Sequence, residues 1–400
     1  MKRLLLVCLF CPGLMCCMAQ STGKDSLDVS LNNVFEVELN LHVGKLIKIH
    51  GEYPSNKTSS VTELAFSFKT RGKKRWHVHN HFPSVGFSLV HVQFGNRDVL
   101  GDAFGVFPHA RFQLKKGRVP LFIRGGLGAA AFTKPYNALH NPENLVLGSR
   151  IANISQIGLA TLIPVGEKFR LTAGLSGTHS SDFHLRVPNI GANIVALSVG
   201  ISYCNKRKWL DQIVEPKEIV APTISKWKCG FHGILGFHEF QGTIEPKGGP
   251  VYPVYGVSLF ASKSSGLRDR IGVGINAQYY TAFHDYIIGQ ELFSDDADER
   301  WNASNLVLFV QYEWMLGHFA MQFQLGVNLH APFYHALNQV WDLPKNGFIN
   351  EWTASKLGYR YYLLNPLAAR FPGRSAFVGV AIKTNGGTAD FLETSVGFIF

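Results

Sequence analysis

Short segments in which apolar and polar residues alternate recur along most of the chain. Each is about 10 to 14 residues long, and residues typical of turns separate it from the next. A period of two places successive side chains on opposite faces of a β-strand. The segments of the first half are Ser59–Thr70, Ser84–Gly95, Gly101–Leu114, Pro120–Thr133, Ile154–Pro164, Phe169–Ser181 and Ala192–Cys204.

The second half repeats this pattern. A more weakly patterned stretch, Val34–Val43, brings the expected total to roughly 14 to 16 strands. About ten residues at the tilt of a barrel strand cross the apolar slab of a bilayer. The segments of the second half are Cys229–Gln241, Val254–Ser262, Asp269–Ala282, Leu306–Met315, Ala320–Ala331, Tyr359–Leu364, Ala376–Thr384 and Phe391–Phe400.

The last segment shows what the alternation implies. In LETSVGFIF, which is residues 392–400, the even-numbered residues are apolar apart from Thr394, and the odd-numbered residues include Glu393 and Ser395. One face therefore suits lipid and the other a polar lumen. The terminal Phe400 is also the residue type with which outer-membrane barrels commonly end.

We therefore expect an all-β, transmembrane, antiparallel β-barrel of about 14–16 strands in the cell outer membrane. The alternative is two eight-stranded barrels in series, because each half could form a small barrel. Lys206–Lys226 is charged, contains proline and lacks alternation, which indicates a connector. The expected parts are residues 20–205 as a first barrel half, residues 206–226 as the connector and residues 227–400 as the C-terminal barrel half.

The N-terminal residues MKRLLLVCLFCPGLMCCMAQ have the pattern of an export signal. Lys2 and Arg3 precede an apolar run that closes on a small-x-small site at Cys17 and Ala19, so residues 1–19 are expected to be a signal peptide. A lipoprotein signal at Cys16 or Cys17 is the alternative, with Met15 a poor residue before an acylated cysteine. No later stretch is long and apolar enough for a membrane helix.

Composition agrees with an envelope barrel. The chain has 40 Gly, 30 Phe and 13 Tyr but only 17% charged residues, which suits many short strands with aromatic side chains near lipid. The net charge of +11 implies an anionic neighbour, which for a barrel could be phosphorylated lipid rather than nucleic acid, and charge alone does not decide between them. Outside the signal, Cys204 and Cys229 could form a disulfide, or they could be two unrelated residues.

Two loops and one histidine tract have weaker functional signals. The loop Phe293–Asn305 carries acidic residues that could bind a divalent cation or simply be solvated, and Phe333–Lys356 is a second expected external loop. In WHVHNHF, three histidines would share a strand face and could hold a metal, but a loop is favoured and no metal site is assigned. The residues concerned are Asp295, Asp296, Asp298, Glu299, His77, His79 and His81.

Two clusters of basic residues also have two possible roles. Their side chains could contact lipid phosphates or could be solvated turn residues. The residues are Arg71, Lys73, Lys74, Arg75, Lys115 and Lys116.

Residues 169–203 carry the informative chemistry. On the segment Phe169–Ser181, the apolar face continues by period two to His179 and Ser181. On the returning segment, Asn193 falls in the row of Val195 and the apolar residues that follow it. The turn before His179 is short and hence periplasmic, whereas the turn between the two segments is longer and external. Three polar groups are thus expected to meet on the lipid face at the outer rim.

These three groups could form a hydrolytic site. In that site Ser181 would be the nucleophile, His179 its general base and Asn193 the group that fixes the imidazole tautomer. Polar groups that face hydrocarbon are costly unless they hydrogen-bond one another. The alternative is that His179 and Ser181 are merely interfacial rim residues.

The segment resembles the signature of the lipid A 3-O-deacylase (PagL-like, or acyloxyacyl hydrolase-like) family of outer-membrane β-barrels. That signature is a His-x-Ser-Asn tract, a Pro-Asn-x-Gly turn and a third catalytic residue, which match His179, Ser181, Pro188, Asn189, Gly191 and Asn193. The segments FPSVGFSLVHVQFGN, KPYNALHNPENLVLGSRIAN and KTNGGTADFLETSVGFIF resemble a long, two-part branch of the family. The resemblance implies that residues 20–205 are the deacylase-like half.

Two positions depart from the family pattern. The Asn after the nucleophile is Asp182 here, and the charged third member is Asn193. An amide stabilises an imidazolium less than a carboxylate does, so Asp182 could orient the imidazole instead. Asp182 and Asn189 are also candidates for support of the oxyanion, together with backbone N–H groups near Asp182 and Phe183.

The resemblance implies a serine esterase that removes an ester-linked acyl chain from lipid A without a cofactor. Its expected partners are the lipopolysaccharide of the outer leaflet and the membrane, with no nucleic acid, and the sequence does not indicate an oligomeric state. A channel and a structural outer-membrane barrel are the alternatives. A channel needs a continuous polar lumen, whereas the esterase needs its three residues clustered outside the wall.

Overall fold

A computed structural model describes most of the chain. The described residues are 34–48, 51, 53–71, 74–115, 119–205, 226–240, 247–266, 268–293, 298–340, 351–364, 374–386 and 388–400. The expected signal peptide, residues 1–19, lies outside this part, as do residues 206–225 of the expected connector.

The N-terminal part forms one closed antiparallel barrel of eight strands, in which β1 pairs with β8. Consecutive strands are neighbours all the way round, so the chain runs up and down the wall. The strands are β1 (Phe35–Leu46), β2 (Ser59–Lys69), β3 (Ser84–Gln93), β4 (Asp102–Lys115), β5 (Leu121–Phe132), β6 (Ile151–Val165), β7 (Phe169–Ser181) and β8 (Ala192–Cys204).

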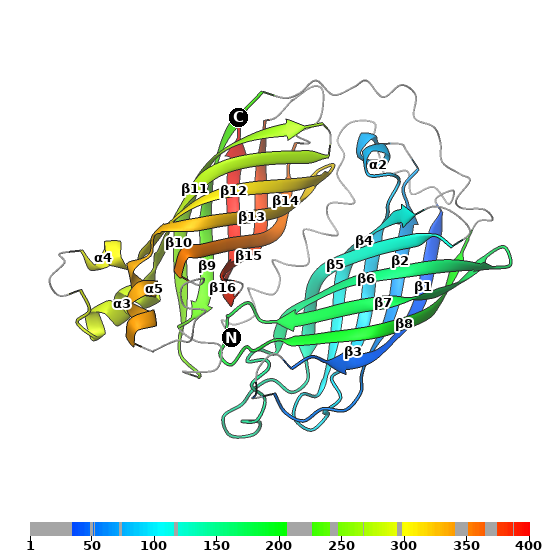
Figure 1. The fold of residues 1–400 in the computed structure, drawn as a ribbon, viewed down its shortest axis with the longest axis horizontal. Helices are drawn as coiled ribbons and strands as arrows, with labels where there is room; N and C mark the ends of the chain where they lie inside the picture. Colours follow the sequence, from blue (N-terminus) through cyan, green and yellow to red (C-terminus); the bar gives the residue numbers. More distant parts are fainter. Residues whose placement is uncertain are drawn as a thin grey trace.

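The C-terminal part forms a second closed barrel of eight strands, in which β9 pairs with β16. The two barrels lie side by side (Figure 1). The strands are β9 (Lys228–Glu239), β10 (Val251–Ser265), β11 (Asp269–Tyr280), β12 (Ser304–Leu316), β13 (Phe319–His330), β14 (Thr353–Tyr362), β15 (Ser375–Asn385) and β16 (Thr388–Ile399).

The described residues thus form sixteen strands, within the range that the alternation predicts. The observed arrangement is the alternative of two eight-stranded barrels in series. A single barrel is wrong because β8 pairs with β1 and not with β9.

Four helices in the described part lie outside the barrel walls. They are α2 (Arg75–His79), α3 (Thr281–Gly289), α4 (Glu299–Asn302) and α5 (Pro332–Val340). Among the described residues, no helix is long and apolar enough to cross a bilayer. The loop expected at Phe293–Asn305 contains α4. The loop expected at Phe333–Lys356 contains most of α5 and the start of β14.

Several smaller expectations are corrected by the structure. The histidine tract, expected to be a loop, is helical over Arg75–His79 (α2), and no group of three or more metal-ligating side chains occurs in the described residues. Cys204 is buried, Cys229 is exposed and both are free thiols. The strand expected at Tyr359–Leu364 begins six residues earlier, at Thr353.

The two faces of each strand differ as expected for a membrane barrel. Along β7 the outward residues Phe169, Leu171 and Leu175 are about half exposed, whereas the inward residues Arg170 and Thr172 are buried. The same contrast holds in both barrels: Leu197 and Val396, for example, are each 68% exposed. The wall therefore presents an apolar exterior around a polar interior, the arrangement of a transmembrane β-barrel.

Buried ion pairs fill the lumen of the N-terminal barrel. The Arg111 guanidinium bonds the carboxylates of Glu36 and Glu38, with 2.6 Å to Glu38 Oε2. Further round the wall, Arg124 bonds Glu63. An eight-stranded barrel is just wide enough for side chains to fill, and these pairs satisfy charges that would otherwise be costly to bury.

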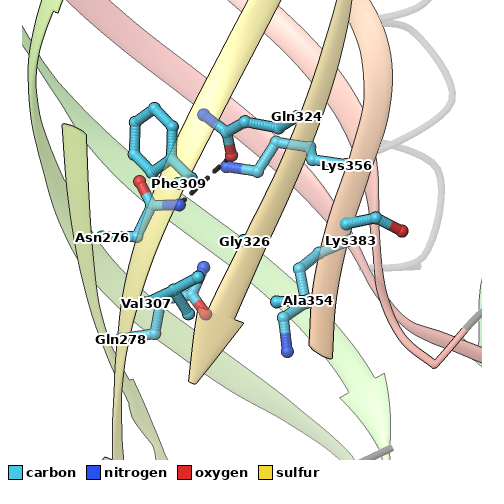
Figure 2. A pocket seen from close by; sticks show the side chains of 10 residues that line it. Asn276, Gln278, Val307, Phe309, Gln324, Gly326, Ala354, Lys356 and Lys383 are labelled. Carbon is cyan, nitrogen blue, oxygen red and sulfur yellow. Dashed lines mark hydrogen bonds between the residues drawn. The ribbon is translucent and has the colours of Figure 1, made fainter. Parts of the chain in front are cut away.

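The lumen of the C-terminal barrel is filled in the same way. Glu313 accepts hydrogen bonds from Arg360 at 2.5 Å and from Tyr362 at 2.7 Å, and all three side chains are buried. Figure 2 shows residues that line a cavity in the same lumen, among them Asn276, which donates to Gln324 at 3.2 Å. The volume of this cavity is about 10 Å³. That volume suits about one water molecule. Because the described side chains fill both lumens, the structure argues against the alternative that the protein is a channel.

The lengths of the turns indicate that the two barrels have the same orientation across the membrane. The β6–β7 and β12–β13 turns are short, whereas the β7–β8 loop and the segment that holds α3 and α4 lie at the opposite ends of their barrels. Short turns are periplasmic and long loops external in outer-membrane barrels. At the periplasmic end the barrels meet, where Trp314 Nε1 donates to Asn80 Oδ1 at 2.7 Å and the Trp314 ring lies 4.5 Å from that of Phe112.

Candidate active site

Strands β7 and β8 bring the three predicted site residues together. His179 lies directly opposite Asn193 in the antiparallel register, and Ser181 is the last residue of β7. His179 and Asn193 continue the outward rows of their strands and are partly exposed, whereas Ser181 is 8% exposed. The cluster thus lies on the outer wall at the external rim, as the alternation predicts, and not in the lumen.

A chain of hydrogen bonds connects the three side chains. His179 Nδ1 lies 2.8 Å from Asn193 Oδ1, and His179 Nε2 lies 3.2 Å from Ser181 Oγ. Because an amide oxygen only accepts, this pairing requires the tautomer with the proton on Nδ1. Nε2 then presents its lone pair to the Ser181 hydroxyl, which is the arrangement of a general base beside a nucleophile.

Asp182 does not contact the imidazole. Its Oδ1 accepts from the backbone N–H of His184 at 3.1 Å, and its own N–H donates to Asn189 Oδ1 at 3.1 Å. The two residues therefore organise the β7–β8 loop, and the group on His179 Nδ1 is Asn193. Because Asp182 N–H is already engaged by Asn189, it is a poor donor to an oxyanion in this conformation.

Gly191 allows the loop to pass close behind the site. Its φ of +77° is in the left-handed region, and a Cβ there would lie 3.2 Å from Ser180 O and 3.4 Å from His179 Cε1. Glycine is the residue that adopts such a φ without steric cost. Tyr53, from the β1–β2 loop, donates its hydroxyl to Gly191 O at 2.6 Å and holds this close approach.

Two residues near the site were not predicted from the sequence. Tyr53 is 138 residues from Gly191 in the chain, and Glu239, at the end of β9, contacts the β7–β8 loop from the second barrel. Neither carries a motif, and only the pairing of distant segments brings them to the loop. Of the two basic clusters, Lys73 and Lys116 lie outside the described residues.

Burial of the Asp182 carboxyl gives the fold a pH dependence. Desolvation raises the pKa of Asp182 from 3.8 to about 7. Between those values the unfolded state has lost the proton while the folded state keeps it, so stability should fall as pH rises from about 4 to about 7. Asp182→Asn keeps the acceptor for His184 N–H and should raise the unfolding midpoint in denaturant at pH 8 but not at pH 4. Equal midpoint shifts at both pH values would contradict this assignment.

Two family models match the chain. Residues 61–202 match lipid A 3-O-deacylase (PagL), and residues 226–400 match the acyloxyacyl hydrolase C-terminal domain. No protein of curated function matches the sequence significantly.

Solved structures resemble the chain only distantly. The crystal structure of the outer-membrane enzyme PagL has a TM-score of 0.30 and 17% identity, over 41% of this chain and 97% of that one. CdiB from Acinetobacter baumannii has a TM-score of 0.18 and 9% identity, over 92% and 60% of the two chains. A mutant porin of Rh. blastica has a TM-score of 0.18 and 8% identity, over 92% and 99%. Likeness at this level does not bear on activity.

The boundary between the two family models falls between the two barrels. The first covers strands β2 to β8 nearly completely, including His179, Ser181 and Asn193, and the second covers β9 to β16. Together they span most of the chain, and they agree with the resemblance carried by the His-x-Ser tract. The protein therefore belongs to the lipid A 3-O-deacylase (PagL) family of outer-membrane β-barrels and carries that family's acyloxyacyl hydrolase C-terminal domain.

Proposed function

We propose that this chain removes an ester-linked acyl chain from lipid A in the outer leaflet, with Ser181 as nucleophile, His179 as general base and Asn193 as the group that orients the imidazole. The observation that carries the proposal is the outward-facing hydrogen-bond chain Ser181–His179–Asn193. Its place at the external rim of the lipid-facing wall is where an acyl ester of lipopolysaccharide would lie. The family's ester hydrolysis supplies the reaction type.

The chemistry follows from the geometry. His179 Nε2 takes the proton from Ser181 Oγ as the oxygen attacks the ester carbonyl, and the imidazolium then gives that proton to the leaving alkoxide oxygen of lipid A. A water molecule, activated by the same imidazole, hydrolyses the acyl-enzyme and releases the fatty acid. Throughout, Asn193 Oδ1 keeps the Nδ1 proton in place. No step requires a cofactor.

The neutral third residue sets the rate. A carboxylate at position 193 would attract the imidazolium that forms during attack, whereas the Asn193 amide offers only its dipole. The site should therefore work more slowly than one with an acidic partner.

Asn193→Asp tests this reasoning. The substituted carboxylate can accept the same Nδ1 proton at the same place, and we expect kcat to rise about tenfold, equivalent to roughly 1.4 kcal/mol of barrier. The measurement is fatty-acid release by the purified protein in lipopolysaccharide micelles. An unchanged or lower kcat in a folded variant would show that the charge of residue 193 does not limit the reaction.

The direct test of the function is mass spectrometry of lipid A. Cells that express the protein should contain lipid A that lacks one ester-linked acyl chain, and cells without the protein should not. Identical spectra, together with no fatty-acid release by the purified protein, would reject hydrolysis and favour a non-catalytic outer-membrane barrel.

A further inference from the structure

The β7–β8 loop, Asp182–Gly191, joins the nucleophile strand to the strand of Asn193. Its second half rests on the N-terminal barrel's own loops. Ile190 N–H donates to Leu145 O at 3.2 Å, and Gly191 N–H donates to Val146 O at 3.0 Å. The end of the loop nearest Asn193 is thus fixed within the same barrel.

The first half of the loop rests on the other barrel. Val187 N–H donates to Glu239 Oε2 at 2.9 Å, and Glu239 N–H donates to His184 O at 3.1 Å. Arg186 extends the contact, because its guanidinium donates to Gly249 O at 2.8 Å and lies 3.8 Å from Glu239 Oε2. Both the side chain and the backbone of Glu239 therefore hold the loop.

The surroundings of the Glu239 carboxylate stabilise this contact. Its side chain is fully buried, and a buried carboxylate is stable only where hydrogen bonds and opposite charge satisfy it. One carboxylate oxygen accepts from the loop at Val187 and the other accepts from Gly249 N–H, which belongs to the second barrel. The carboxylate thus bridges the two barrels at the external rim.

The loop needs external contacts to keep its shape. Phe183 and His184 have φ values of +60° and +68°, a left-handed conformation that residues other than glycine rarely adopt. The His184 backbone is held on both sides, since its N–H donates to Asp182 Oδ1 and its carbonyl accepts from Glu239 N–H. The backbone of Glu239 thus holds His184, and its carboxylate holds Val187 three residues further along the same loop.

We propose that Glu239 is a positioning residue for the acyl hydrolysis, through which the C-terminal barrel holds the active-site loop of the N-terminal barrel in its working conformation. The role rests on the proposed function of Ser181, His179 and Asn193. Glu239 touches none of these three side chains. It acts through the loop whose two ends carry the nucleophile and the orienting amide, and small misplacements of reacting groups lower rates strongly.

The test uses the full-length protein with Glu239→Ala and Glu239→Gln. Glu239→Ala removes both acceptors, and kcat for fatty-acid release should fall at least tenfold while KM changes less than about twofold. Glu239→Gln keeps one amide oxygen and should have an intermediate kcat. In the same variants, hydrogen exchange of the Val187 amide should accelerate, whereas the amides within β7 should remain protected.

Glu393→Gln is the matched control. Glu393 is a buried carboxylate of the same barrel, but it pairs with Lys356 at 2.5 Å and not with the loop. Its substitution should leave kcat and Val187 exchange as in the wild type. If the two Glu239 variants remain folded, as judged by heat-modifiable gel mobility, and keep wild-type kcat or Val187 exchange, the positioning role is overturned.

A fluorophosphonate probe separates this result from failure of the proposed function. The probe should label Ser181 in the wild type and label Glu239→Ala more slowly, without any need for lipid A. A wild type that neither reacts with the probe nor releases fatty acid would overturn the hydrolase and, with it, the catalytic role of Glu239. Wild-type labelling combined with unchanged labelling in both Glu239 variants would overturn only the positioning role.

Discussion

Ser181→Ala is expected to abolish the release of fatty acid from lipid A, and His179→Ala is expected to lower it by about 10⁴-fold or more. The serine hydroxyl is a weak nucleophile until a base takes its proton, and His179 Nε2 is the base within reach, at 3.2 Å from Ser181 Oγ. Each substitution removes one member of a unit that functions only when complete. The measurement is single-turnover acyl release by purified, folded protein.

Ser180→Ala is the matched control for these two variants. Ser180 is adjacent to the nucleophile on β7, but its side chain is buried on the lumen side of the wall. We expect it to keep at least half of the wild-type activity. Should Ser181→Ala and Ser180→Ala have equal activity, Ser181 would not be the nucleophile.

Gly191→Val should lower kcat about hundredfold without preventing barrel assembly. The β-branched side chain would have to adopt a φ of +77°, and its Cβ would lie 3.2 Å from Ser180 O and 3.6 Å from Ser181 Cβ. The loop must then move away from the site, which displaces Asn193 and lengthens its bond to His179. Kinetics with lipopolysaccharide micelles, alongside gel mobility as the assay of assembly, measure both effects.

Gly125→Val provides the comparison. Gly125 is an exposed residue of β5, and a Cβ there meets no atom within 4 Å. This variant adds the same side chain to the same barrel and should retain normal kinetics. A similar loss of kcat in the two variants would mean that Gly191 has no special role.

Alternation predicted the strands well because the membrane and the lumen impose opposite demands on successive residues. The start of β14 was missed for a physical reason: its inward row contains Lys356, a long cation that is buried by pairing with Glu393. Alternation also fixes which face each residue occupies but not which strands pair at the seam. Alternation therefore could not correct the expectation of one barrel in favour of the observed two.

The site was predictable to the extent that it is local. His179, Ser181 and Asn193 lie on two consecutive strands joined by one loop, so period two and a short motif were enough to place them on one face. Tyr53 and Glu239 reach the same loop from other parts of the fold. Their contribution depends on the closure of the first barrel and on its contact with the second, which no local pattern encodes.

The separate closure of the two barrels has a consequence for biogenesis. Every strand partner of the first barrel is present once the chain has passed Cys204, because the β1–β8 seam pairs Glu36 with Cys204. This half can therefore be completed while the second half is still being delivered to the membrane. Glu239, however, joins the β7–β8 loop only after β9 has formed. Under the proposed positioning role of Glu239, the protein should therefore gain its full activity only once the C-terminal barrel has assembled.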